Sequence, residues 1–210
     1  MSFIAWINSF SLPTGASIKQ NVLGDPSHKE DRPFNTQQEM LKRFPVNADG
    51  GVCAQITNTF IRARLSGNNP TFLESEQQTY DEILKEAKIQ DTQLQAGDKD
   101  VRHSAFTTTG AQHTHTEFSH EEMSTAKKFK EKFGKSRYGM FSRPTDDKKR
   151  THLIAFERDS ALNECGFFDP DLPGGYYKGD CEAIIEAFTE VNKLYYSKNT
   201  SLPTVAGLAL

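Results

Sequence analysis

One sequence feature limits how this chain can fold more than any other. It is a cysteine that follows a glycine turn and stands where a helical pattern begins. Gly50 and Gly51 stand just before Cys53, and glycine allows the chain to turn sharply and to approach a ligand closely. Apolar residues then recur at helical spacing, at Val52, Ile56, Phe60 and Ala63. A cysteine in the first turn of a helix lies at the positive end of the helix dipole, which favours the nucleophilic thiolate. The pattern predicts a reactive Cys53, and a buried, inert cysteine at an ordinary helix start is the alternative.

The composition describes one polar globular domain. The chain has 210 residues, of which 36% are hydrophobic and 25% are charged, and this length is enough for one good core. No apolar run approaches the roughly 18 residues that a membrane-spanning helix requires. The formal net charge of −3 gives no general attraction to nucleic acid. Residues 2–7 are apolar but lack the cationic start and the cleavage site of a signal peptide.

The cysteines are three in number, which is odd and too few for a disulfide framework, so a reducing compartment fits best. Cys165 and Cys181 have no base beside them in the sequence, and we expect both to be structural. A bridge between these two remains open at this point. Cys53 is therefore the candidate for chemistry.

The order of the hydrophobic patterns predicts an α+β fold over residues 34–196, with helices packed on a central antiparallel sheet. A loosely ordered N-terminal arm over 1–33 is expected to precede this domain, and a C-terminal tail over 197–210 to follow it. Helices are expected over 35–44, from residue 53 to a turn at 67, over 71–88 and 119–134, and from 180 to about 194; strands are expected over 138–143, 151–157 and 166–169. In the polar segment 89–118, either a strand over 101–108 or low order is expected.

A histidine and an aspartate are placed to support the cysteine. A cysteine nucleophile needs a base to take its proton, and the imidazole needs an acceptor that fixes its tautomer. His152 begins an apolar strand pattern, and Asp169 follows 17 positions later (169 − 152) after two phenylalanines. Two neighbouring antiparallel strands would bring both side chains to one end of the sheet. The alternatives are a solvent-facing histidine at a strand end and an ordinary Asp-Pro turn.

Two aspartates flank Pro170, and only one of them is expected to orient His152. Proline disfavours the helical region for the residue before it, so Asp169 should be extended and continue the strand. Asp171 leads into the Leu-Pro-Gly-Gly sequence of residues 172–175 and is expected to turn away into solvent. The sequence therefore favours Asp169.

Three short blocks, taken in order, resemble the YopT-type bacterial effector cysteine proteases, which are papain-like enzymes. The blocks are Gly51–Ile56, His152–Ala155 and Phe167–Pro170, and the resemblance covers roughly residues 45–190. It implies a papain-like fold without a cofactor, with Cys53 as nucleophile, His152 as general base and then acid, and Asp169 as the orienting carboxylate. The family usually has Asn after Asp-Pro, then an aromatic residue and glycine, whereas this chain has Asp171 and Leu172 there.

Papain-like enzymes also use a side-chain amide upstream of the cysteine to hold the oxyanion. Asn47, six residues before Cys53, is the candidate for this role, and a turn asparagine is the alternative.

Other polar groups have simpler interpretations. His113 and His115, together with His103 and His120, could suggest a metal site. No cysteine or carboxylate pattern completes a known ligand spacing, so a polar loop without metal is expected. The basic run 127–132 is expected to be a solvated helix face, with docking to an acidic surface or anionic lipid as the minor alternative.

The resemblance implies a cysteine protease that cleaves a small set of host-cell proteins through an acyl-enzyme. Its partners would be host protein substrates and not nucleic acid, with at most weak membrane contact, and the chain is expected to be a monomer. It would be secreted from a bacterium into the host cytoplasm without a conventional signal peptide. A glutamine deamidase or amide-transfer enzyme with the same triad is one alternative, and a non-catalytic binding module that keeps the fold is another.

Overall fold

The computed structural model describes residues 52–68, 76–98, 100–144, 151–172, 176–195 and 202–210. Several expected features lie outside the described residues: the arm over 1–33, the helix over 35–44, Asn47 and the glycines of the turn before Cys53.

A six-stranded antiparallel sheet forms the centre of the fold, in the order β1-β6-β2-β3-β4-β5. Its strands are β1 (His113–Phe118), β2 (Tyr138–Pro144), β3 (Thr151–Asp159), β4 (Glu164–Phe168), β5 (Tyr176–Asp180) and β6 (Thr204–Ala209). The strands predicted near 138, 151 and 166 are confirmed as β2, β3 and β4. The predicted α+β class with a central antiparallel sheet is also confirmed.

The C-terminal segment was wrongly predicted to be a tail. Residues 204–209 form β6, which lies inside the sheet between β1 and β2. Every residue of β6 except Val205 is buried, so the segment is a core strand. The described part of the domain therefore extends past residue 196. β5, with the sequence Tyr-Tyr-Lys-Gly-Asp, was not predicted either.

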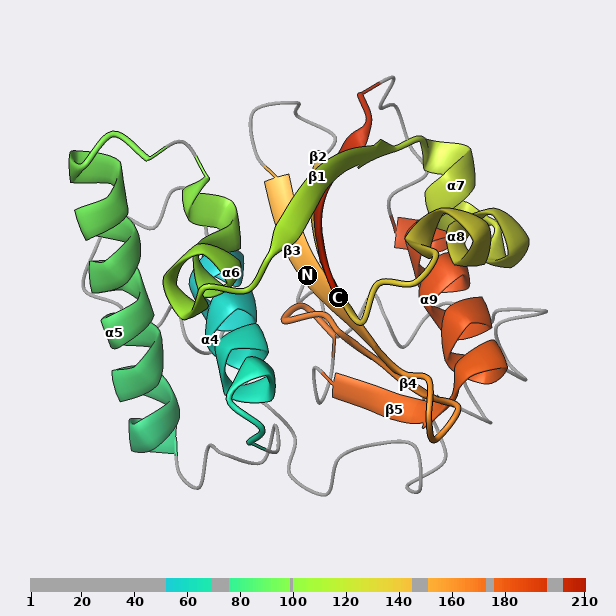
Figure 1. Ribbon diagram of the computed structural model, residues 1–210, viewed down its shortest axis with the longest axis horizontal. Helices are drawn as coiled ribbons and strands as arrows, with labels where there is room; N and C mark the ends of the chain where they lie inside the picture. Colours follow the sequence, from blue (N-terminus) through green and yellow to red (C-terminus); the bar gives the residue numbers. More distant parts are fainter. Residues whose placement is uncertain (1–51, 69–75, 99, 145–150, 173–175, 196–201) are drawn as a thin grey trace, which may run out of the picture.

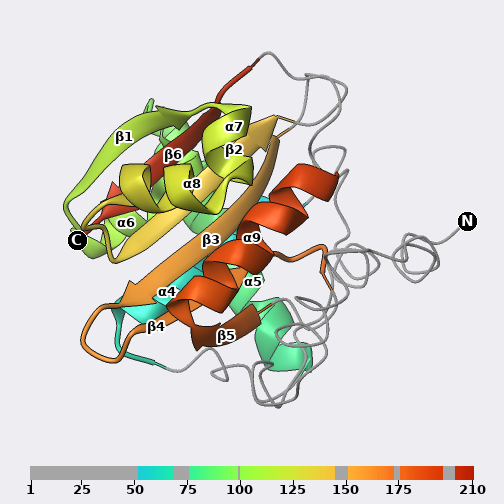
Figure 2. The ribbon, with the colours of Figure 1, turned by 90° about the vertical axis from the view of Figure 1, so that its right-hand side faces the viewer.

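Seven helical segments lie among the described residues. They are α4 (Cys53–Leu65), α5 (Glu76–Gln95), the 3₁₀ turn η4 (Val101–His103), α6 (Ser104–Thr109), α7 (His120–Ser124), α8 (Ala126–Phe133) and α9 (Cys181–Tyr195). Figure 1 shows α4, α5 and α6 on one side of the sheet and α7, α8 and α9 on the other. Figure 2 shows α8 and α9 lying across their face of the sheet. The fold is thus a sheet between two helical layers.

The helix predicted over 119–134 begins as expected but is interrupted. Ser119 Oγ accepts the Glu122 N–H at 3.2 Å, and the Glu122 carboxylate accepts the Ser119 N–H at 2.7 Å, which is the predicted capping box. Thr125 is extended, with φ −127° and ψ 113°, and separates α7 from α8. Gly134 ends α8 with a positive φ of 60°.

The strand predicted over 101–108 is wrong, and so is low order there, because this segment is helical. Asn58 of α4 supplies a reason. Its amide donates to the Arg102 carbonyl at 2.9 Å and its Oδ1 accepts the Ala105 N–H at 2.8 Å. A buried side chain thus satisfies backbone groups where the 3₁₀ turn passes into α6, an effect that local propensity cannot reveal.

Each face of the sheet has its own hydrophobic core. On the α7–α9 face, Phe129, Phe156 and Phe188 pack with centroid distances of 4.9–5.2 Å. On the α4 face, Ile56 and Phe60 are fully or almost fully buried against β3 and β4 residues. Among the described residues, no helix is long and apolar enough to cross a membrane.

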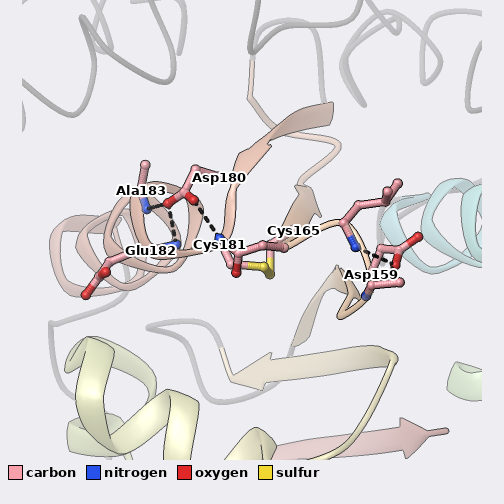
Figure 3. The surroundings of a disulfide bond; sticks show 9 residues. Asp159, Cys165, Asp180, Cys181, Glu182 and Ala183 are labelled. Carbon is pink, nitrogen blue, oxygen red and sulfur yellow. Dashed lines mark hydrogen bonds between the residues drawn. A yellow bond between two sulfur atoms is a disulfide. The ribbon is translucent and has the colours of Figure 1, made fainter.

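Cys165 of β4 and Cys181 at the start of α9 form a disulfide, so the bridge that the sequence left open is present. Figure 3 shows Asp180 beside it, with its carboxylate accepting the backbone N–H groups of Glu182 and Ala183 at 2.9 and 3.4 Å. Asp180 thereby satisfies the first turn of α9. Cys53 is a free cysteine.

Candidate active site

Helix α4 is fixed along strand β3 by polar contacts at several points. Thr57 Oγ1 donates to the Leu153 carbonyl at 2.9 Å, one turn after Cys53. Near the other end of the helix, Arg64 makes a bidentate ion pair with Glu157 at 2.7 and 2.9 Å. Tyr176 of β5 donates to the same carboxylate. Charge-assisted bidentate pairs fix geometry as well as energy, so the register of α4 on β3 is well defined.

Aromatic stacking ties the same helix to β4. The rings of Phe60 and Phe168 lie 4.4 Å apart with an angle of 6° between their planes. Both are almost completely buried, and offset stacking adds to the burial of their area. Because Phe168 directly precedes Asp169, this contact also sets where Asp169 lies relative to the cysteine helix.

Cys53 is the first residue of α4 and is buried, with 6% of its surface exposed. Its Sγ lies 3.7 Å from the carbonyl oxygen of Thr151, the residue before His152. The Cys53 side chain is also hydrogen-bonded to that of His152. The N-terminus of this 13-residue helix brings its first N–H groups and the positive end of its dipole to the sulfur, as the sequence predicts.

His152 and Asp169 meet at one end of the sheet, because β3 begins where the antiparallel β4 ends. His152 Nε2 lies 2.7 Å from Asp169 Oδ1, and both side chains are buried. The same oxygen accepts the backbone N–H of Asp171 at 3.0 Å. Two donors on one oxygen hold the carboxylate in place, and the carboxylate in turn fixes the imidazole with Nε2 protonated.

The sequence analysis predicted that Asp171 would turn away into solvent, and this prediction is wrong. Asp171 Oδ2 lies 3.5 Å from His152 Nδ1, and the Asp171 side chain is 27% exposed. A turn explains this approach. Strand β4 ends at Phe168, and the Asp169 carbonyl then accepts the Leu172 N–H at 3.1 Å. The chain therefore bends directly after Asp169, and Asp171 stays beside His152.

The surroundings of His152 favour its cationic form. Burial alone would lower its pKa, but the charge and hydrogen bond of Asp169, the hydrogen bond with Cys53 and the charge of Asp171 together hold that pKa well above the usual value of 6.5. The site therefore places a proton donor beside the candidate nucleophile.

The structure thus brings together the three residues that the sequence singled out, Cys53, His152 and Asp169, from α4, β3 and the end of β4. Asn47 is outside the described residues, so its position is not tested. Asp171 was missed as a neighbour of the imidazole. The available signal was the Asp-Pro-Asp sequence of residues 169–171, because an aspartate before proline favours a turn that keeps neighbouring side chains close together.

The histidines that the sequence analysis assigned to a polar loop are placed differently. His113 and His115 lie on β1, and with His103 they surround Asp100. His120 begins α7 instead. The i, i+2 spacing of His113 and His115 on a strand was the signal that could have indicated this cluster.

Comparison with known proteins supports the fold. No protein-family model and no curated protein matches the chain. Among solved structures, the crystal structure of the Pseudomonas avirulence protein AvrPphB is similar, with a TM-score of 0.52 and 14% sequence identity. The match covers 80% of this chain and 97% of that one. The likeness extends over nearly the whole of AvrPphB, and the chain has a papain-like α+β fold.

Proposed function

We propose that this chain is a papain-like cysteine protease in which Cys53 is the nucleophile, His152 the general base and acid, and Asp169 the orienting carboxylate. The observation that carries the proposal is the buried His152, which is hydrogen-bonded to Cys53 and to Asp169. A nucleophile, a base and a group that orients the base, each within reach of the next, are the parts that acyl transfer requires.

The proposed reaction follows from these contacts. Cys53 transfers its proton to His152 and the thiolate attacks a peptide carbonyl, forming a C–S bond and an oxyanion. The N–H groups at the start of α4 lie on the sulfur side, where an oxyanion would develop. His152 then protonates the leaving amine as the C–N bond breaks, which gives a thioester. Finally His152 takes a proton from water, the water oxygen attacks the thioester, and the thiol is released with its proton restored.

The likeness to a Pseudomonas avirulence protein supports the bacterial-effector part of the proposal. The three sequence blocks that resemble YopT-type proteases support the same assignment. We therefore propose that the substrates are host-cell proteins and that the chain acts inside the host cell.

The experiment compares host-cell protein N-termini after exposure to the full chain or to its Cys53→Ala variant. New N-termini that depend on Cys53 are expected, and the His120→Ala variant, at a half-buried histidine on α7, is a matched control that should produce the same set. Identical N-termini in the Cys53→Ala sample and in the sample with intact Cys53 would contradict proteolysis.

The same samples separate two other activities. An intact substrate whose mass rises by about one dalton at a glutamine would indicate deamidation by the same acyl-enzyme chemistry. Stable capture of a host protein, with no covalent change and equal strength in Cys53→Ala, would indicate a binding module.

A further inference from the structure

We propose that Asp100, His103 and His115 form a binding site for a divalent transition-metal ion such as zinc, separate from the cysteine site. One nitrogen of each histidine and one carboxylate oxygen lie within 4.8 Å of one another. Two imidazoles and a carboxylate are a donor set that zinc and related ions prefer, and with three protein ligands a fourth position stays open.

The cluster is organised around one carboxylate. Asp100 Oδ1 lies 2.6 Å from His103 Nδ1, and Asp100 Oδ2 lies 3.1 Å from His115 Nε2 and 3.2 Å from His113 Nε2. Ligand atoms around a tetrahedral zinc ion are about 3.4 Å apart, given bonds of about 2.0–2.1 Å. The contact between Asp100 and His115 is already close to this spacing, whereas the 2.6 Å contact between Asp100 and His103 Nδ1 would lengthen by about 0.8 Å if the ion replaced its shared proton.

The fold builds the site from three separate segments. His103 ends the η4 turn, His115 lies on β1, and Gly207 of β6 is the register partner of His115. A Cβ at Gly207 would lie 3.1 Å from the His103 ring, so the absent side chain leaves the space that this ring occupies beside His115. The two rings meet edge to face, with centroids 5.3 Å apart.

A buried nitrogen points to a missing partner. His103 is 2% exposed, and its Nε2 is buried without a hydrogen-bond partner among the described residues. An unsatisfied buried nitrogen is costly, and the His103 ring offers an ion either its Nδ1, which faces Asp100, or this unpartnered Nε2. His115 is 49% exposed, which gives an ion a path from solvent.

His113 would support the ligands without belonging to the closest set. Its Nε2 contacts the same Asp100 oxygen as His115, and its Nδ1 lies 3.2 Å from the Ala111 carbonyl. Groups that hydrogen-bond to a ligating carboxylate fix its orientation and tune its affinity for metal. The ion would join the η4 turn, which Asn58 of α4 holds through the Arg102 carbonyl, to the edge strand β1.

The test is a titration of the full chain with zinc, without a polyhistidine tag. All proteins carry Cys53→Ala, so that the thiol cannot bind the ion, and a chromophoric chelator competes for it. One equivalent of zinc is expected to bind. His115→Ala, at a half-exposed position, should weaken binding by more than about 100-fold, and His113→Ala by about 10- to 100-fold. His120→Ala is the matched control and should bind like its parent.

Two further measurements distinguish a specific metal site from adventitious zinc binding. Zinc at about 100 times its dissociation constant should raise the melting temperature of the parent by about 5–10 °C, and calcium or magnesium should not. Cobalt should give a visible spectrum that His103→Ala and His115→Ala both abolish. Zinc binding of equal strength in the parent and in His115→Ala would overturn the proposal, as would the absence of binding at micromolar zinc. Binding that only His152→Ala removes would place the ion at the cysteine site and overturn it too.

Discussion

Asp171 Oδ2 lies 3.5 Å from Nδ1 of His152, while Asp169 Oδ1 lies 2.7 Å from Nε2, so one imidazole has a carboxylate near each of its nitrogens. The two carboxylates differ in their exposure to water. Asp169 is buried and makes the short contact, whereas Asp171 is partly exposed and more distant. Solvent screens the Asp171–His152 interaction more than the Asp169–His152 interaction. We therefore expect Asp169 to matter most for turnover and Asp171 mainly for the pKa of His152.

Asp169→Ala should lower kcat by about three to four orders of magnitude, because the imidazole then loses the group that fixes its tautomer. Asp169→Asn should retain part of the activity, since its amide oxygen can still accept the Nε2 proton without the charge. Initial rates on a substrate from the host-cell experiment provide the measurement. Near-normal turnover in Asp169→Ala would show that another group orients His152.

Asp171→Asn should leave kcat within about tenfold of the parent, because the backbone N–H that supports Asp169 is retained. The negative charge of Asp171 helps to raise the pKa of His152. Its removal should therefore move the alkaline limit of kcat/KM to lower pH, since the imidazolium deprotonates earlier. A pH–rate profile of both proteins tests this, and a shift toward higher pH would contradict the assignment.

Cys53→Ala and His152→Ala should each abolish turnover, and the double variant should be no worse than either single one, because the two side chains act as a unit. Circular dichroism should show an intact fold in Cys53→Ala. If Cys53→Ser retained full activity, Cys53 would not be the nucleophile.

The stability of the protein should depend on pH through His152. Its pKa is raised on folding, so its contribution to the free energy of unfolding is fully present below about pH 6.5 and is lost as the pH rises through the folded-state pKa. We expect urea unfolding in a Cys53→Ala background to show falling stability above pH 6.5. The same series with His152→Gln should lack that component. A difference between the two that grows with pH would have the wrong sign.

Opening the Cys165–Cys181 bridge should lower the free energy of unfolding by about 3 kcal/mol, the loop-entropy value for a loop of about 15 residues, given their separation of 16 positions. Urea unfolding of Cys53→Ala with and without reductant gives this difference. Without reductant, an alkylating agent should label only Cys53 in the otherwise unaltered chain, as mass spectrometry would show. Labelling of Cys165 or Cys181 under those conditions would contradict the pairing.

The candidate site could be anticipated because its signals are local. A helix start after glycines marks Cys53, a strand start marks His152, and an Asp-Pro step marks Asp169. Each is a chain position where a side chain can be held at the end of an element. That Asp171 lies beside His152 depends on how the turn after Asp169 is packed against the start of β3, which the sequence alone does not show.

The parts of the fold that sequence reasoning missed depend on distant partners. Residues 101–109 contain β-branched residues but are helical, because Asn58 satisfies their backbone. β6 has a short Thr-Val-Ala-Gly-Leu-Ala sequence without clear alternation, since both of its faces are covered. Its glycine fits a histidine ring that lies about a hundred residues earlier in the chain. These contacts between distant residues exist only in the assembled sheet, so local sequence patterns do not predict them.

The position of β6 also imposes an order on folding. Among the strands that the structure describes, β1 pairs with β6 alone, so the strand that carries His113 and His115 joins the described sheet only after residues 204–209 have been synthesised. During translation, the backbone N–H and C=O groups of β1 therefore lack their β6 partner at a stage when the β2–β3 hairpin can already form. A ribosome that stalls before residue 204 would release a chain containing Cys53, His152 and Asp169 but with a split sheet, and such a chain would be a ready substrate for chaperones or proteases.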